Sequence, residues 1–209
     1  MFAENIIAFV VTATALTMAP GLDTAMVLRS ALANGGRHGA LTAVGVAAGC
    51  LCWGSAAVLG LSALLQAWPL AFLALKWGGA AYLAWLGAQL LLHPREAIVP
   101  GHVATSPSPR YGASIMRGFG TNILNPKVGL FYVSFLPQFV PRTEIGSNYA
   151  FWLACSAARI ALVWFTLLAT ITAAIRPWLK SARVAKALDR MTGGVFLILG
   201  FKLTQIANA

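Results

Sequence analysis

Residues 39–75 read GALTAVGVAAGCLCWGSAAVLGLSALLQAWPLAFLAL, a run of 37 residues without Asp, Glu, Lys or Arg. The hydrocarbon core of a bilayer is about 30 Å thick and takes about 20 helical residues, so this run is too long for one transmembrane helix. Gln66-Ala67-Trp68-Pro69 divides it, because Pro favours the first turn of a helix and Trp favours the membrane interface. The run therefore predicts two spans, over 39–65 and 69–92.

The same composition extends over the whole chain of 209 residues. Hydrophobic residues make up 59% and charged residues 10%, with a mean hydropathy of +0.76. Soluble domains are about 45–50% apolar and about 25% charged, and disordered chains are more polar still. We expect an all-α polytopic membrane protein whose six transmembrane helices cover residues 4–28, 39–65, 69–92, 113–140, 147–175 and 188–206.

The basic residues predict the orientation of these helices. The chain has 15 Lys and Arg against 5 Asp and Glu. Ten of the basic residues fall in or beside the first, third and fifth loops, whereas the fourth loop has only Arg142 and the second has none. Because Lys and Arg favour the cytoplasmic side, we expect both termini outside. Basic residues spread over three loops without interleaved aromatic residues do not indicate nucleic-acid binding.

The one long polar segment, residues 93–112, carries four prolines and divides the chain into two blocks. We expect a first three-helix repeat over 1–92, a cytoplasmic linker over 93–112 and a second three-helix repeat over 113–209. A block with an odd number of spans enters the membrane in the opposite orientation the second time. The halves are therefore predicted to be inverted repeats, an arrangement that many secondary transporters use.

The first helix of each block is interrupted by proline deep within its apolar run. Ala19-Pro20-Gly21 interrupts the first block, and Asn125-Pro126 interrupts the second. Such breaks free backbone carbonyls and amides, and irregular backbone at membrane depth persists only beside protein or water. Either break alone would favour the simpler interpretation, a kink that shapes packing. Two breaks at matched depth, each close to a charge, favour a substrate or ion path.

The charges near the breaks are Asp23 and Lys127. A charged side chain within a transmembrane helix costs about 2.5–3.5 kcal/mol, so one that is kept usually faces an interior cavity. The two residues either form a salt bridge that holds the halves together, or Asp23 receives an amine or a proton while Lys127 meets a carboxylate. Arg159 is a third candidate for carboxylate binding, although it could instead extend toward the interface. Asn122 and Asn125 offer polar contacts or bonds between helices.

Other residue patterns carry less information about function. Gly45 and Gly49 form a small-xxx-small pair that predicts close helix packing and a possible homodimer face. Cys50 and Cys52 lack the Cys-x-x-Cys spacing of dithiol sites, but they keep a membrane thiol-redox transporter open as an alternative function. The histidines have no metal-ligand spacing, so no metal site is expected. The sequence has no recognisable catalytic set, and we expect a protein that is not an enzyme.

At these motifs the chain resembles the LysE/RhtB family of bacterial amino-acid exporters. The likeness runs nearly end to end and rests on the following segments: PGLD at 20–23, NGGRHG at 34–39, GVAAG at 45–49, KWGGAAYL at 76–83, GFGTNILNPK at 118–127, FYVSFLPQF at 131–139 and DRMTGG at 189–194. In one departure, Leu22 stands where the family usually has a second proline. In another, Arg159 stands where we expect a neutral or acidic residue.

The resemblance implies an exporter in the bacterial inner membrane, driven by the proton gradient and without a cofactor. It implies that Pro20, Gly21, Asp23, Asn125, Pro126 and Lys127 line or shape the transport path. The expected substrate is a small amino acid or derivative, such as threonine, homoserine, homoserine lactone or a lysine-like compound. Asp23 with Lys127 or Arg159 would supply the anionic and cationic contacts that a zwitterion needs.

Overall fold

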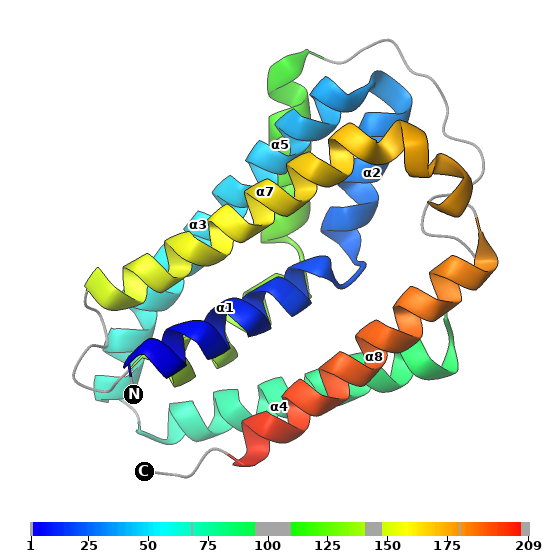
Figure 1. The fold of residues 1–209 in the computed structure, drawn as a ribbon. Coiled ribbons are helices and arrows are strands. Elements are labelled where there is room, and N and C mark those ends of the chain that lie inside the picture. Colours follow the sequence, from blue (N-terminus) through cyan, green and yellow to red (C-terminus); the bar gives the residue numbers. More distant parts are fainter. Residues whose placement is uncertain (1, 68, 95–109, 141–147, 180, 206–209) are drawn as a thin grey trace.

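The computed structural model describes residues 2–67, 69–94, 110–140, 148–179 and 181–205 of the chain, and the elements in these ranges are helices (Figure 1). Most of the predicted linker over 93–112 lies outside the described residues. In chain order the elements are α1 (Phe2–Met18), α2 (Leu22–Asn34), α3 (Gly36–Ala67), α4 (Pro69–Leu92), α5 (Tyr111–Ile123), α6 (Pro126–Leu130), the π-helix η1 (Phe131–Phe135), the 3₁₀-helix η2 (Leu136–Phe139), α7 (Asn148–Leu179) and α8 (Ala182–Gln205).

The helix boundaries differ most from the predicted spans at two places. The helical backbone of the first segment continues past residue 28 to Asn34, where Gly35 ends it with a φ of +90° that favours glycine. Helix α8 begins at Ala182 rather than at residue 188. The prediction followed the charge-free stretch, but Ala, Arg and Lys are strong helix formers, so the helix extends beyond the apolar run.

Two helices within the described residues meet the length and hydropathy expected of a membrane span. They are the parts of α3 and α7 over Gly36–Gly60 and Asn148–Thr172. Helices α1 and α2 meet it together as a pair bent by 53°. The described structure therefore confirms a helical protein with apolar spans, while the full set of six stays a prediction.

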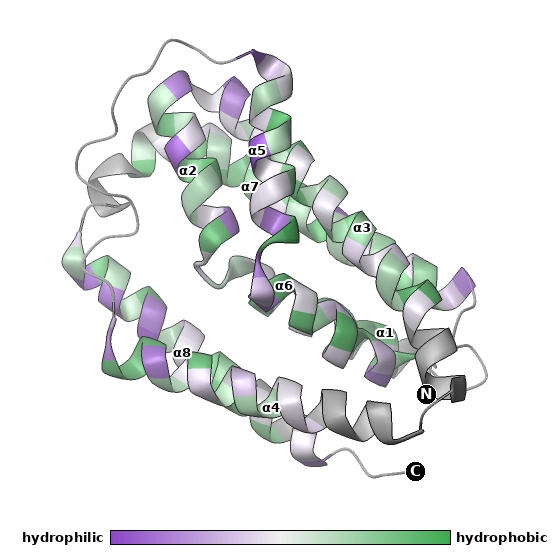
Figure 2. Ribbon diagram, turned by 180° about the vertical axis from the view of Figure 1, so that it is seen from behind, coloured by the Kyte–Doolittle hydropathy of each residue, from purple (hydrophilic) through white to green (hydrophobic). Residues whose placement is uncertain are grey.

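The helices form two layers, and α1 and the α6–η2 segment lie between them (Figure 1). Helix α3 lies along α7, and α4 lies along α8 on the opposite side of the molecule (Figure 1). Helix α1 runs beside the α6–η2 segment, where the ring of Phe9 is 5.8 Å from that of Phe131 and 5.4 Å from that of Phe139. Seen from behind, hydrophilic residues gather toward the end that holds the α2–α3 connection and the start of α8 (Figure 2).

Helices α3 and α5 approach one another so closely that only glycine fits at their crossing. A Cβ atom on Gly45 would overlap the backbone of Ile115, and one on Gly118 would overlap the backbone of Thr42. Gly49 likewise leaves room for the side chain of Asn122. The predicted close packing of Gly45 and Gly49 is therefore found within the chain, against α5. These two glycines are not free to form a homodimer face, and the predicted homodimer would need another surface.

Candidate functional site

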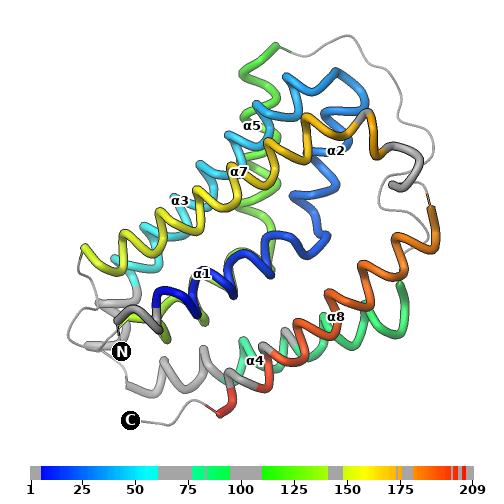
Figure 3. Tube along the Cα trace, viewed as in Figure 1, coloured from blue at the N-terminus to red at the C-terminus, as the bar shows by residue number. Residues whose placement is uncertain are grey.

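The first part of the site is the break between α1 and α2, where the chain turns sharply (Figure 3). In an unbroken helix the carbonyl of Leu16 would accept the N–H of residue 20, but that residue is proline and has none. The ammonium of Lys127 replaces it: Nζ donates to the carbonyl oxygens of Leu16 at 3.1 Å and Ala19 at 2.9 Å. A cation at the carboxyl end of a helix is also favoured by the helix dipole. Lys127 thus caps α1 from the other half of the chain.

The second part is the break between α5 and α6, which Asn125 organises with both ends of its amide. Its Oδ1 accepts the backbone N–H of Lys127 at 3.1 Å and so caps α6, which has Pro126 in its first turn. Its Nδ2 donates to Oδ2 of Asp23 at 3.1 Å. Residues of the second half of the chain thus bond to the break in the first half, and Asp23 of the first half accepts a hydrogen bond from the break in the second.

Asp23 lies in the first turn of α2 and is the centre of the cluster. It is only 4% exposed. Its Oδ2 accepts from Asn122 at 3.0 Å and from Asn125, and it interacts electrostatically with the charge of Lys127. Its Oδ1 is buried and makes no hydrogen bond within the described structure. A buried carboxylate oxygen without a partner is costly, which points to a proton or a ligand group that occupies this position.

A small cavity of about 30 Å³ adjoins Asp23 and Lys127. Cys50 and Tyr132 also line it, and the Sγ of Cys50 lies 3.5 Å from Nδ2 of Asn122. The cavity has room for a water molecule or an ammonium group, but not for a whole amino acid. Sequence reasoning missed Tyr132 as a site residue, although it stands in the FYVSFLPQF motif and in a π-helix, which is common at functional sites.

A much larger pocket of about 440 Å³ lies on the other side of Lys127. We call it the vestibule. It falls in the size range of small-molecule sites. Both breaks contribute to it through Pro20, Gly21, Asn125, Pro126 and Lys127, and the opposite layer contributes Tyr82, Leu86, Gln89, Leu90, His93 and Phe196. Sequence reasoning missed these last residues; the only signal was a few polar side chains in the apolar second half of α4.

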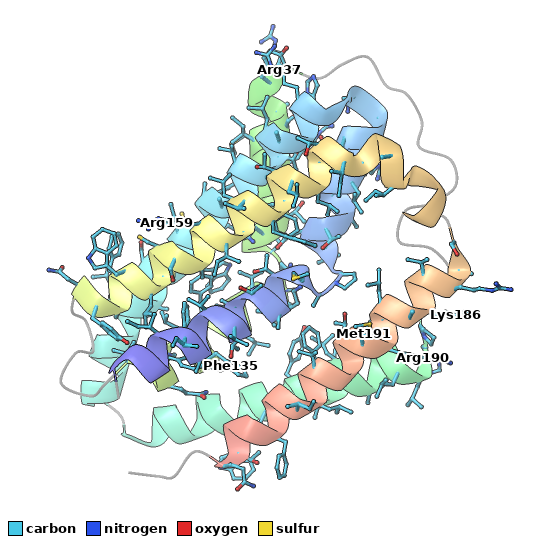
Figure 4. All side chains as sticks on the ribbon, viewed as in Figure 1. Arg37, Phe135, Arg159, Lys186, Arg190 and Met191 are labelled. Atoms are coloured by element: carbon cyan, nitrogen blue, oxygen red, sulfur yellow. The ribbon has the colours of Figure 1, made fainter. Side chains whose placement is uncertain are left out.

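The structure brings together seven of the eight predicted site residues and separates the eighth. Pro20, Gly21, Asp23, Asn122, Asn125, Pro126 and Lys127 meet at the two breaks. The side chain of Arg159 is exposed and lies over the ring of Trp152, with 5.6 Å between Cζ and the ring centroid. Ala157 and Ala161 of the same helix line the small cavity, so Arg159 projects from the opposite face of α7 (Figure 4).

Replacement of Arg159 by alanine should therefore leave transport nearly unchanged. We expect the rate of amino-acid efflux from proteoliposomes to stay within about twofold, because the side chain faces away from the two breaks and its removal costs only an exposed cation–π contact, worth about 0.5–1 kcal/mol of stability. Lys127→Ala serves as the comparison, since it removes the other candidate for the cationic contact. Loss of efflux in Arg159→Ala with an intact fold would restore Arg159 to the transport path.

The alternative based on a cysteine pair finds no support in the geometry. Cys50 is buried beside Asn122, whereas Cys52 is exposed, because residues two apart on a helix point to different faces. Both are free thiols. The described structure thus does not assemble the accessible dithiol that a thiol-redox transporter requires.

Comparison with known proteins identifies the family. The family model described as LysE type translocator matches residues 14–205. The chain belongs to the LysE family. The motifs at 20–23 and 118–127 predicted the same family, and the match confirms it.

Relatives within the LysE family match the chain over nearly its whole length. A membrane protein of Bacillus subtilis, YrhP, is 30% identical over 95% of this chain and 98% of its own. A homoserine/homoserine lactone efflux protein of Salmonella typhimurium is 29% identical over 97% of both chains. A leucine efflux protein of Klebsiella pneumoniae is 30% identical over the full length of both. No solved structure matches the chain.

Proposed function

We propose that this LysE family member exports a small amino acid across the bacterial inner membrane and is driven by the proton gradient. The observation that carries the proposal is the meeting of the two helix breaks, where Asp23, with its unpartnered Oδ1, and Lys127 line the same small cavity. Two groups of opposite charge at one cavity suit the ammonium and carboxylate of an amino acid. The names of the relatives, which include homoserine and leucine efflux proteins, support the same class of substrate.

Competition at Asp23 would couple the substrate to the proton. A carboxylate oxygen accepts either the ammonium group of an amino acid or a proton, but not both at once. A proton that arrives from outside therefore displaces the substrate there, and its release inside lets the next substrate bind. This order gives export against inward proton flow, and Lys127 would hold the carboxylate end of the substrate.

Six spans in two inverted repeats would supply the framework for this exchange. Helix α3 pairs with α7 and α4 pairs with α8, which are equivalent positions in the two proposed repeats, and the first segment of each repeat is broken. The tight α3–α5 crossing joins the two halves and would oppose rocking of one half against the other. We infer that the α4–α8 layer moves instead, because pockets of about 440 Å³ each separate it from the α1–α2 break on two sides.

Efflux from proteoliposomes tests the proposed function directly. Vesicles that contain the purified chain are preloaded with a panel of labelled amino acids, and a proton gradient is imposed in either direction. We expect the gradient that drives protons toward the substrate side to speed efflux of one or a few neutral amino acids. Empty vesicles and vesicles with a protonophore are the controls.

Two results would count against the proposal in different ways. Efflux whose rate does not depend on the direction of the proton gradient would support amino-acid export and contradict proton coupling. No protein-dependent movement of any amino acid, in either direction, would contradict amino-acid export itself.

A further inference from the structure

The walls of the vestibule carry information about the side chain of the substrate. Its lining is largely apolar, with Leu22, Ala25, Leu86, Leu90 and Phe196 among its members. Lys127 is the one residue with a permanent charge among the described residues that line it, and no Asp or Glu is among them. Asp23 lies behind this wall and faces the small cavity instead.

Besides Lys127, one basic residue lines the vestibule and another lies on a neighbouring helix turn. His93 lines the vestibule directly after α4 and is the first residue of the predicted cytoplasmic linker. Arg29 is exposed on α2, one turn beyond Ala25 and on the same helical face.

The vestibule therefore offers different contacts to the carboxylate and to the side chain of a substrate. The ammonium of Lys127 attracts a carboxylate, and burial of an uncharged side chain against the apolar wall lowers the free energy of binding. A second ammonium, at the end of a long side chain, finds no carboxylate partner among the residues that line the vestibule. Its desolvation would be uncompensated, and it would be repelled by Lys127.

We propose that the vestibule selects amino acids with a free carboxylate and an uncharged, mainly apolar side chain, and that it rejects lysine-like substrates and substrates without a carboxylate. This inference rests on the proposed export function and makes it specific. It chooses among the substrates that the sequence left open, because a lysine-like compound carries the extra cation and homoserine lactone lacks the carboxylate.

Two matched pairs of compounds test the selection in proteoliposomes. Norleucine and lysine share a four-carbon side chain and differ by its terminal ammonium, and leucine and leucinamide differ by the carboxylate. We expect norleucine to be exported at least about 10-fold faster than lysine, and leucine at least about 10-fold faster than leucinamide. Equal rates within either pair would overturn the inference while amino-acid export stands.

A new carboxylate in the vestibule should reverse part of this preference. Gln89→Glu keeps the shape of a side chain that lines the vestibule and adds the missing partner for an ammonium. We expect it to reduce the norleucine-to-lysine ratio by at least about fivefold. His93→Glu, at the exposed end of α4, provides a second variant that leaves the helix packing intact.

Gln205→Glu is the matched control, since it makes the same exchange at an exposed position at the far end of α8. It should leave the ratio unchanged. An unchanged ratio in both Gln89→Glu and His93→Glu, or an equal fall in Gln205→Glu, would overturn the inference. If no compound of the panel is carried by the wild-type chain, the proposed export function fails and the selection fails with it.

Discussion

Asp23→Asn is expected to lower proton-driven amino-acid efflux by about 100-fold, equal to about 2.7 kcal/mol of lost stabilisation along the transport cycle. The amide oxygen can still accept the hydrogen bonds that Asn122 and Asn125 donate to Oδ2. The amide nitrogen then takes the position of the unpartnered Oδ1, where it neither binds a proton nor accepts one from an ammonium group. Efflux from proteoliposomes under an imposed proton gradient measures the effect.

The same variant separates two roles of Asp23 when exchange is measured without a gradient. If Asp23 binds only the proton, labelled substrate still exchanges for unlabelled substrate across the membrane. If Asp23 also receives the substrate ammonium, exchange is lost as well, and this is the result we expect. Asp23→Glu keeps the charge and should retain part of both activities. Wild-type rates of efflux in a well-folded Asp23→Asn protein would remove Asp23 from the mechanism.

The position of the candidate site was largely predictable from sequence, because its key residues are of types that are costly to place within an apolar helix. A carboxylate, an ammonium and two prolines within apolar segments all need a local reason to be there, and the structure places them together. The hydrogen bond from Lys127 to the carbonyl oxygen of Leu16, which has no N–H partner because residue 20 is proline, could not be predicted. It forms only because the two breaks are in contact, and no local sequence pattern encodes that contact.

The residues that were not predicted from sequence are of common types, and only their position beside the cavities makes them candidates for function. Tyr132 and Gln89 have no unusual spacing, and only the packing of η1 and α4 brings them to the cavities. Arg159 is the opposite case: its charge within an apolar helix predicted a site residue, but it lies on the face of α7 that points away from the site. Helix α8 was predicted too short because hydropathy marks the bilayer, whereas helix propensity decides where a helix begins.

Gly118→Ala is expected to destabilise the protein more than any other single methyl group added to α5. The new Cβ would overlap the carbonyl of Thr42 and would lie 3.1 Å from the backbone nitrogen of Val46. Backbone atoms of a packed helix cannot move aside as a flexible side chain can, so α3 and α5 must separate. Overpacking of this kind costs about 1–3 kcal/mol, and we expect the upper end of that range. Thermal unfolding of the detergent-solubilised protein measures the loss.

Gly120→Ala is the matched control, because it adds the same methyl group two residues further along α5, where no atom lies within 4 Å. Alanine favours a helix over glycine by about 1 kcal/mol, so this variant should be as stable as the wild type or more so. Gly118→Ala should also lose efflux, since Asn122 follows one turn later and separation of the helices withdraws its amide from Asp23. Equal melting temperatures for the two variants would show that the crossing of α3 and α5 is looser than the structure indicates, and would remove the reason to expect that it holds the halves together.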